Sequence, residues 1–218
     1  LNAAFVNVGF EKDAFLHYHD LGPNLASQLK FIKLVTTGKV KDFSLKNFQF
    51  EKEIDKNGVV TDVISANQSI LVQIVKEPIS TKGPRISSEL SLAGRFIVLV
   101  PFSDRVSISQ KIESKEEKER LKRLLQSIKP KGFGVIVRTV AEGKKVTEIE
   151  KDLTTLLDRW SGMCKKLPTA HHPSKVLGEL NRASSILRDV FNDTFSGIHI
   201  DDEELYNQTK DYLQEIAP

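Results

Sequence analysis

The spacing of hydrophobic and polar residues changes along the chain. Up to about residue 86, the apolar residues form short β-branched or aromatic runs, separated by turn signals such as Asn57-Gly58 and Pro78. These runs predict strands in the segments AAFVNVG (3–9), LKFIKLV (29–35), GVVTDVI (58–64) and SILVQIV (69–75). Short strands at this spacing are typical of a small barrel or sandwich. The polar stretch at 39–57 predicts a long loop or a hairpin.

From about residue 87 to 183 the pattern alternates between strand and helix. Strands are predicted at RFIVLV (95–100) and FGVIVRT (133–139), and helices at 114–128 and 147–163. Each helix opens with a hydroxyl three residues before a glutamate, which predicts a capping box. The two pairs are Ser114/Glu117 and Thr147/Glu150. The order strand, helix, strand, helix predicts an α/β unit.

The last part, 184–218, predicts a helix, a short strand GIHI (197–200) and a second helix over 201–216. These elements are too few to bury their own apolar faces, so we expect them to form part of a larger subdomain. The chain also begins without a Met and directly on a strand-like pattern. We therefore expect it to be a piece of a longer protein.

Composition narrows the class of protein. The 218 residues are 39% hydrophobic and 28% charged, which fits a globular protein of one or two domains. A net charge of +3 and a pI near 8.8 permit a polyanionic partner without requiring one. The single cysteine, Cys164, excludes an intramolecular disulfide and suits a reducing compartment, so a cytoplasmic location is expected. No apolar run approaches the roughly 20 residues of a membrane span, and no membrane segment is expected.

Aromatic and basic residues in the first part are candidates for nucleic-acid binding. Phe5 and Phe15 flank a turn, and exposed rings on a small β module give bases a flat face on which to stack. Lys82 can meet a backbone phosphate, and the neighbouring Gly83 would let that phosphate approach. The alternatives are that the two phenylalanines belong to the core and that the lysine is only solvated.

A second group of polar residues lies at the end of the strand predicted at 133–139. Arg138 can bind phosphate oxygens through two parallel hydrogen bonds, and the Thr139 hydroxyl can complete the contact. Lys144 and Lys145 follow, and amides at the start of the next helix can point at the same anion. The pattern predicts an anion site. The alternative is a surface strand end with scattered basic residues.

Other polar groups give weaker signals. The acidic run at 201–204 can be interpreted as metal ligands, but acids in a first helical turn favour the helix dipole, so capping is the better explanation. The adjacent histidines at 171–172 have no partner at ligand spacing. Cys164 has no activating base that the sequence reveals, so an inert thiol is expected. No metal site is therefore predicted.

Five stretches carry a further signal. They are AAFVNVGFEKDAFLH (3–17), KGPRIS (82–87), LAGRFIVLVP (92–101), ISQKIE (108–113) and GFGVIVRTVAEG (132–143). In this order they resemble the ribonuclease E/G family of bacterial endoribonucleases. The likeness runs over almost the whole chain and is weakest at 39–57 and in the last third. Several separate motifs in one order make it specific.

The resemblance implies an α+β, multi-domain fold. Residues 1–86 would form an S1-like OB-fold β-barrel that binds RNA and is truncated, because its first strands are missing. Residues 87–183 would form an α/β domain that senses the 5′ monophosphate of RNA. Residues 184–218 would form part of an RNase H-like subdomain.

The resemblance also assigns site residues. Those that match the family's RNA-contacting aromatics and lysine are Phe5, Phe15 and Lys82. Those that match its 5′-phosphate pocket are Gly94, Val98, Lys111, Arg138 and Thr139. Lys111 stands where some members have Arg, and Gln110 replaces another basic residue of the family.

The family's catalytic Mg²⁺ is held by aspartates of a DNase I-like domain further along. The resemblance therefore implies no catalytic residue and no metal ligand in this chain. The family's cysteine pair for an intersubunit zinc link is also absent. The parent protein is expected to be a homo-oligomeric, Mg²⁺-dependent endoribonuclease that prefers single-stranded RNA with a 5′ monophosphate.

The leading hypothesis is an RNA-binding and 5′-monophosphate-sensing segment of a single-strand-specific endoribonuclease that acts in RNA processing and decay. The sequence does not distinguish the E branch from the G branch. One alternative is a stand-alone, non-catalytic RNA-binding protein. Another, from a different class, is a self-contained metal nuclease that uses Asp201, Asp202 and Glu203.

Overall fold

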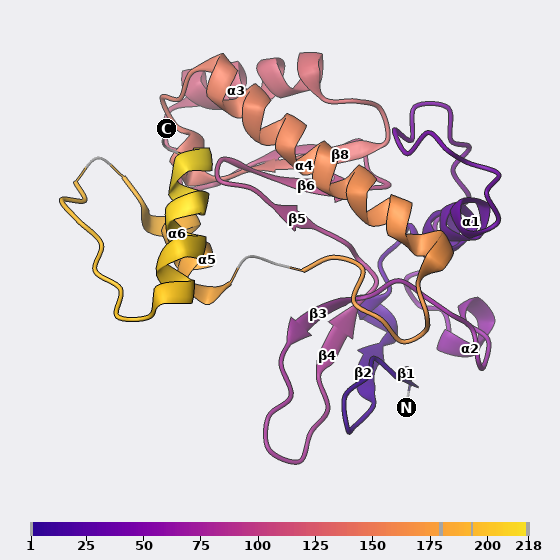
Figure 1. The fold of residues 1–218 in the computed structure, drawn as a ribbon. Coiled ribbons are helices and arrows are strands. Elements are labelled where there is room, and N and C mark those ends of the chain that lie inside the picture. Colours follow the sequence, from indigo (N-terminus) through magenta and orange to yellow (C-terminus); the bar gives the residue numbers. More distant parts are fainter. Residues whose placement is uncertain (1, 179–180, 193, 217–218) are drawn as a thin grey trace. The chain divides into compact units, whose positions relative to one another are not determined.

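A computed structural model of the chain describes residues 2–178, 181–192 and 194–216, with side chains as far as Gln214. It divides into two compact units, Leu1–Val176 and Leu177–Pro218. The first unit contains two four-stranded sheets and the long helix α4 (Figure 1). The described fold is therefore mixed α+β. No described helix is long and apolar enough to cross a membrane.

The first sheet has the strand order β1-β2-β4-β3. Its elements are β1 (Ala3–Val6), β2 (Ala14–His17), β3 (Gln73–Lys76) and β4 (Arg85–Ser87), with η1 (Tyr18–Asp20), α1 (Leu25–Thr36) and α2 (Val60–Val63) between β2 and β3. Two antiparallel hairpins are joined by a short parallel contact at Phe15 and Arg85. The described strands leave this sheet open, so they do not close the barrel that the resemblance implied.

Strand β2 sets the two faces of this sheet. Its side chains alternate, as expected for a strand with one buried face. Ala14, Leu16 and Tyr18 are buried, whereas Phe15 and His17 are half-buried on the other face. The buried residues form a core with residues from η1, α1, α2 and β4, namely Leu21, Leu25, Val60 and Ile86. The face that carries Phe15 is left for other contacts.

Two predicted strands in this part are wrong. LKFIKLV lies within helix α1, where Leu25, Phe31 and Val35 are buried at helical spacing. The seven-residue stretch hid this period because it begins one turn after the start of the helix at Leu25. GVVTDVI contains the single turn α2, whose Val60 inserts into the core and whose Val60 amide donates to Asn2 Oδ1 at 2.8 Å.

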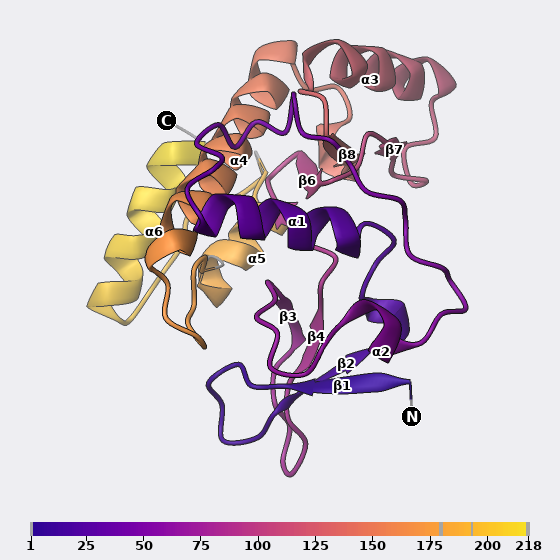
Figure 2. The same ribbon diagram turned by 90° about the vertical axis from the view of Figure 1, so that its right-hand side faces the viewer.

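The stretch at 39–57 is a long loop, as predicted, and it covers an aromatic cluster. The rings in the cluster are Phe31, Phe48, Phe102, Phe133 and Trp160, with centroids 5.5–6.2 Å apart in the contacting pairs. Trp160 also donates from Nε1 to the Phe43 carbonyl in the loop at 2.9 Å. Figure 2 shows α1, which supplies Phe31, running between the two sheets. The cluster therefore ties α1 and the loop to the second sheet.

The second sheet has the strand order β5-β6-β8-β7. Its elements are β5 (Leu92–Ala93), β6 (Ile97–Pro101), β7 (Val106–Ile108), α3 (Lys115–Ile128), β8 (Phe133–Val137), η2 (Thr139–Ala141), α4 (Val146–Lys166) and η3 (Leu167–Thr169). β7, α3 and β8 form a βαβ unit with parallel strands, and β6 pairs with β8 antiparallel. Helix α4 packs against β5 and β6, and α3 packs against β7. The predicted α/β unit is confirmed.

Of the two hydroxyl groups predicted to cap helices, only the one at the start of α3 does so. Ser114 caps α3, because its hydroxyl accepts from the Glu117 amide at 3.2 Å. Thr147 does not cap α4. Gly143, with φ +70°, turns the chain so that Lys145 is the last extended residue, and the Lys145 amide donates to the Glu148 carboxylate at 2.9 Å.

The second unit contains α5 (Arg182–Val190) and α6 (Glu203–Ile216), which pack against each other. Asn181 caps α5, and Asp202 caps α6 by accepting from the Leu205 amide at 2.7 Å. The capping interpretation of the acidic run is confirmed at Asp202. The strand predicted at 197–200 is wrong, since these residues have no strand partner among the described residues.

Candidate nucleic-acid interface

Phe5 and Phe15 face each other across the β1–β2 hairpin. They are direct partners in its register, with ring centroids 5.9 Å apart and ring planes at 65°. Phe5 is 69% exposed, and Phe15 is half-buried on the face opposite the core. The alternative interpretation, in which both rings belong to the core, is therefore wrong. An exposed edge-to-face pair presents aromatic surface on which bases can stack.

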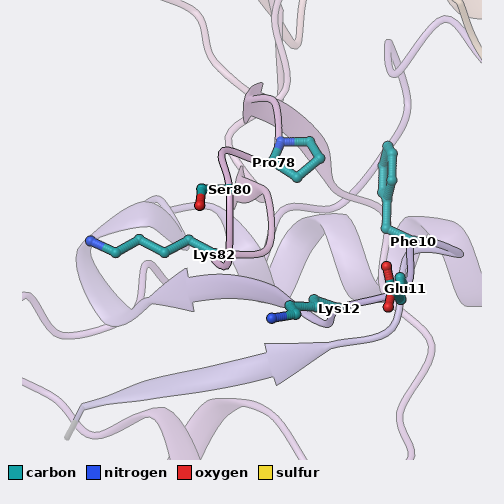
Figure 3. A pocket seen from close by; sticks show the side chains of 6 residues that line it. All are labelled: Phe10, Glu11, Lys12, Pro78, Ser80 and Lys82. Carbon is teal, nitrogen blue, oxygen red and sulfur yellow. The ribbon is translucent and has the colours of Figure 1, made fainter.

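Lys82 lies at the tip of the β3–β4 hairpin, beside the β1–β2 turn. A cleft of about 290 Å³ separates these two turns, lined by Phe10, Glu11, Lys12, Pro78, Ser80 and Lys82. Figure 3 shows the amino groups of Lys12 and Lys82 pointing away from Phe10. The Lys12 ammonium donates to the Thr81 carbonyl at 2.9 Å, which ties the two turns together. The cleft thus combines apolar surface with two cations and one carboxylate, that of Glu11.

Gly83 has a packing role that the sequence did not reveal. A Cβ at this position would overlap the carbonyl of Asp13, because β4 begins directly against the end of the β1–β2 turn. The missing side chain is therefore required by the contact between these two segments. The interpretation that Gly83 lets a phosphate approach is not needed to explain the glycine.

The residues of the predicted phosphate pocket lie together around the end of β8. Arg138 follows the strand, and its Nη1 donates to the carbonyls of Gly94 at 2.9 Å and Arg95 at 3.2 Å. The Thr139 hydroxyl lies 2.9 Å from the hydroxyl of Ser109. Arg138 and Thr139 are both half-buried. Their side chains are thus held by the chain itself, next to the turn between β5 and β6.

Asp152 of α4 organises this turn. Its carboxylate accepts from three successive amides, those of Arg95, Phe96 and Ile97, at 3.1, 2.8 and 3.0 Å. Burial raises the pKa of Asp152 above its usual value, although these donors and the positive charge of Arg138 partly offset that effect. The carboxylate thus provides the hydrogen-bond acceptor for the three amides of the turn.

Gly94 is explained by the same carboxylate. A Cβ there would lie 2.6 Å from both oxygens of Asp152, closer than atoms pack. Gly94 therefore makes room for Asp152, while its assignment to the phosphate pocket stays a prediction. No local sequence pattern pointed to this partner, because Asp152 lies on a helix far along the chain from Gly94.

Val98 and Lys111 lie at the edges of this group. Val98 is central in β6, where it pairs with Ala93 on one side and Ile136 on the other. Lys111 is exposed, and its amide donates to the Ser109 hydroxyl at 3.3 Å. Ser109 was missed by the sequence analysis although it lies in the stretch ISQKIE. It links the Lys111 backbone to the Thr139 hydroxyl.

The basic rim of the group carries an aromatic ring. The Arg95 guanidinium lies 5.3 Å from the centre of the Phe96 ring, and the Lys144 ammonium lies 5.9 Å from it. Lys145, by contrast, is the N-cap residue of α4. Arg138 and Lys144 of the predicted cluster thus lie at the β5–β6 turn, whereas Thr139 contacts Ser109 after β7.

The other candidates are placed as follows. Cys164 is buried, and burial raises the pKa of its thiol to about 12, which makes it unreactive as a nucleophile. His171 and His172 are exposed. Across residues 2–178, 181–192 and 194–216, no three His, Cys, Asp or Glu side chains are grouped as metal ligands.

Comparison with known proteins decides the family. The family model described as "Ribonuclease E/G family" matches residues 91–218, more than half of the chain. The chain belongs to the ribonuclease E/G family. It is 32% identical to Ribonuclease E of a Nostoc species over 98% of the chain, and 31% identical to Ribonuclease G of Haemophilus influenzae over all of it. It is also 29% identical to Ribonuclease G of Escherichia coli K12 over its full length.

The family relatives are longer than this chain. The chain spans 27% of the Nostoc protein, 40% of the Haemophilus protein and 41% of the Escherichia protein. Matches of similar identity carry the names of both branches, so the comparisons leave the E and G branches open. The expected resemblance to the ribonuclease E/G family is confirmed.

Proposed function

We propose that this chain is the RNA-binding and 5′-monophosphate-sensing segment of an endoribonuclease that acts on single-stranded RNA in RNA processing and decay. The observation that supports the proposal is that Arg138 and Thr139, neighbours at the end of β8, are each held by surrounding groups. A guanidinium and a hydroxyl, both held by neighbouring backbone and side-chain groups, offer donors suited to a terminal phosphate. Such donors bind tightly because little conformational freedom is lost on binding.

A terminal monophosphate differs from an internal phosphate in ways that this site can detect. It carries between one and two negative charges near neutral pH and exposes three oxygens. An internal phosphodiester carries one charge and fewer free oxygens. The fork of Arg138 and the hydroxyl of Thr139 match the first better than the second. Lys111 and Lys144 would add positive charge at the rim.

The modules follow from the same proposal. The open sheet β1-β2-β4-β3 with its exposed Phe5–Phe15 pair would be the remaining part of an S1-like OB fold, over residues 1–86. The β7-α3-β8 unit with α4 would be the 5′-sensor domain, over 87–183. The helices α5 and α6 would belong to an RNase H-like subdomain that begins near 184.

The parent protein would supply the chemistry. Its Mg²⁺ would be bound by the aspartates of the DNase I-like domain that the resemblance implies. The ion would stabilise the charge that develops on the scissile phosphate. This chain would hold the RNA and position its 5′ end. The proposal also takes the parent as a cytoplasmic homo-oligomer.

Binding of short RNAs that differ only in their 5′ end tests the proposal. The unmutated chain is expected to bind the 5′-monophosphorylated RNA about tenfold or more tightly than the 5′-hydroxyl RNA, the effect of one or two charge-assisted hydrogen bonds. Arg138→Lys keeps the charge but loses the fork, so the preference should fall close to one. Fluorescence anisotropy with labelled RNAs gives both dissociation constants.

Arg123→Ala is the matched control, because Arg123 is exposed on α3 and outside the group around Arg138. It should lower affinity for both RNAs equally through net charge. Equal affinity for the two RNAs in the unmutated, folded chain would contradict the sensor proposal.

A further inference from the structure

The aromatic surface of the first sheet does not end at Phe5 and Phe15. Phe15 is followed by His17, with ring centroids 6.3 Å apart and planes at 41°, and His17 by His19, at 5.0 Å and 35°. Together with the Phe5–Phe15 pair at 5.9 Å, the contacts connect four rings in one row. We call this set, Phe5, Phe15, His17 and His19, the ring row.

The ring row follows from the alternation along β2. Leu16 and Tyr18 point into the core, so Phe15 and His17 share the opposite face. His19 lies in η1 just beyond the strand and is exposed. In the sequence, the same alternation can be followed through AFLHYH at 14–19. The alternation along β2 therefore places Phe15 and His17 on one open face, and the ring contact with His17 brings His19 next to them.

One hydrogen bond fixes the orientation of His17. Its Nδ1 accepts from the His19 amide at 3.2 Å, so the neutral ring carries its proton on Nε2. The remaining edge of the ring can donate to an acceptor on a ligand. The Nδ1 atom, by contrast, is already used, which leaves it unavailable to a metal ion.

The charges around the ring row suit a polyanion. Asp20, which follows His19, is neutralised by Arg85 through hydrogen bonds of 2.9–3.0 Å. At the other end of the hairpin, Lys12 and Lys82 line the cleft between the two turns. Phosphates would therefore meet two cations and one carboxylate, Glu11, in the cleft, and a paired carboxylate at Asp20.

We propose that the RNA-stacking surface extends from Phe5 and Phe15 onto His17 and His19, so that one single strand lies along β2 from the cleft at its start to η1 at its end. The inference rests on the proposed RNA-binding function. Histidine rings stack on unpaired bases as other aromatic side chains do. A row of rings with few base-specific donors binds single strands with little preference for sequence. The ligand class is therefore single-stranded RNA of mixed sequence.

The test measures binding of 5′-hydroxyl oligouridines of increasing length, so that the proposed 5′-phosphate site is not engaged. For the longest oligomers, His17→Ala and His19→Ala should each weaken binding about fivefold, the lower end of the range for one base stacked on a ring. For the shortest oligomers, which Phe5 and Phe15 can accommodate alone, the same variants should change little. His17→Phe should restore the affinity, because it keeps the ring and removes the imidazole nitrogens.

Controls separate this inference from the proposed function. His171→Ala removes an exposed histidine outside the ring row and should leave every dissociation constant unchanged. Phe5→Ala reports the stacking that the proposed function already requires. If Phe5→Ala weakens binding while His17→Ala and His19→Ala do not, the extension is wrong and the RNA-binding function stands.

Two other results would also overturn the extension. One is an unmutated chain, correctly folded, that binds no oligouridine, because then the proposed function fails as well. The other is an effect of the histidine variants that disappears in EDTA, or that His17→Phe does not reverse, because both indicate metal binding or hydrogen bonding instead of stacking. Melting temperatures of all variants establish that the fold is retained.

Discussion

At the scale of single residues, the carboxylate of Asp152 explains more of the candidate phosphate site than any residue that the sequence pointed to. It binds the amides of residues 95–97, and the same turn presents the carbonyls that hold Arg138. The position of the guanidinium therefore depends on a turn that Asp152 fixes. Gly94 is small because that carboxylate needs the space.

A double-mutant cycle tests this dependence. Gly94→Ala should lower the free energy of unfolding by about 1–3 kcal/mol through overpacking. Asp152→Ala should lower it by about 1–3 kcal/mol because buried amides lose their acceptor. The double variant should lose less than the sum, since without the carboxylate the new methyl group meets no close oxygen. Urea unfolding followed by fluorescence of Trp160, the single tryptophan, gives the four values.

Gly162→Ala is the control for this cycle. Gly162 is also on α4, and a Cβ there meets no atom within 4 Å. Its effect should add to that of Asp152→Ala within error. Additive effects of Gly94→Ala and Asp152→Ala would show that the carboxylate does not restrict position 94.

Site residues can be proposed from sequence where the residue type itself indicates the chemistry. The role of a residue cannot be inferred in this way where it depends on a contact with a distant segment. Arg138 and Thr139 could be proposed because a guanidinium and a hydroxyl at one strand end are phosphate donors by residue type, and their role stays a prediction. Gly83 was expected to allow a phosphate to approach and Gly94 to belong to the phosphate pocket, but the missing side chain at each is explained by an oxygen from a distant segment, Asp13 or Asp152. Such contacts are set by the fold and leave no local pattern.

At the scale of elements, the start of α3 forms only one half of the predicted capping box. Ser114 accepts from the Glu117 amide as expected, but the Glu117 carboxylate turns away to Arg120 at 2.7 Å and to the Gly143 amide at 2.9 Å. The pKa of Glu117 falls to about 2, chiefly because Arg120 donates to it, while partial burial opposes the fall. The helix start is thereby joined to the loop before α4.

This pKa predicts how stability depends on pH. Because the pKa of Glu117 is about 2 in the folded chain and 4.5 as its ordinary value, its contribution is complete above about pH 4.5 and is lost as the pH falls toward 2. Glu117→Gln should cost about 1 kcal/mol at pH 7 and progressively less at lower pH. Thermal unfolding between pH 7 and pH 3 measures the difference.

Glu119→Gln is the matched control, since Glu119 is exposed on the same helix. Its unfolding curve should run parallel to that of the unmutated chain at every pH. A Glu117→Gln deficit that stayed constant down to pH 3 would mean that the side chain acts through packing and that its charge is unimportant.

Elements were predictable where the period of the pattern is long enough to measure. Helices α3 and α4 and strands β6 and β8 were found because amphipathic or continuous apolar runs extend over whole elements. α1 was mistaken for a strand because a short window on LKFIKLV contains β-branched residues and hides the helical spacing from Leu25 to Val35. The strand expected at 197–200 failed for a different reason: a strand needs a partner, and the pattern of one segment does not provide it.

At the scale of the whole molecule, the first unit contains both candidate sites. The aromatic cluster around Trp160 joins α1, the loop at 39–57 and the second sheet, while Leu25 of the same helix lies in the core of the first sheet. The boundary expected at residue 86 stays a prediction, and the two sheets share one compact unit. We expect the two candidate surfaces, which lie in one compact unit, to keep a fixed separation.

A fixed separation predicts a step in the dependence of affinity on RNA length. A 5′-monophosphorylated strand too short to reach from Arg138 to Phe5 can use one surface at a time, whereas a longer strand can occupy both. The second contact then becomes intramolecular, and affinity should rise by about a hundredfold once the strand spans the two surfaces. Titration of oligouridines of increasing length by fluorescence anisotropy locates the step.

The step should require both surfaces and the 5′ phosphate. It should vanish in Phe5→Ala, in Arg138→Lys and with 5′-hydroxyl RNA, and it should remain in Arg123→Ala, which removes only net charge. A smooth rise with length in the unmutated chain, unaffected by either variant, would mean that the two surfaces never hold one strand together. In that case the 5′ phosphate and the aromatic rings would act on RNA separately, and the sensor would not orient the strand along β2.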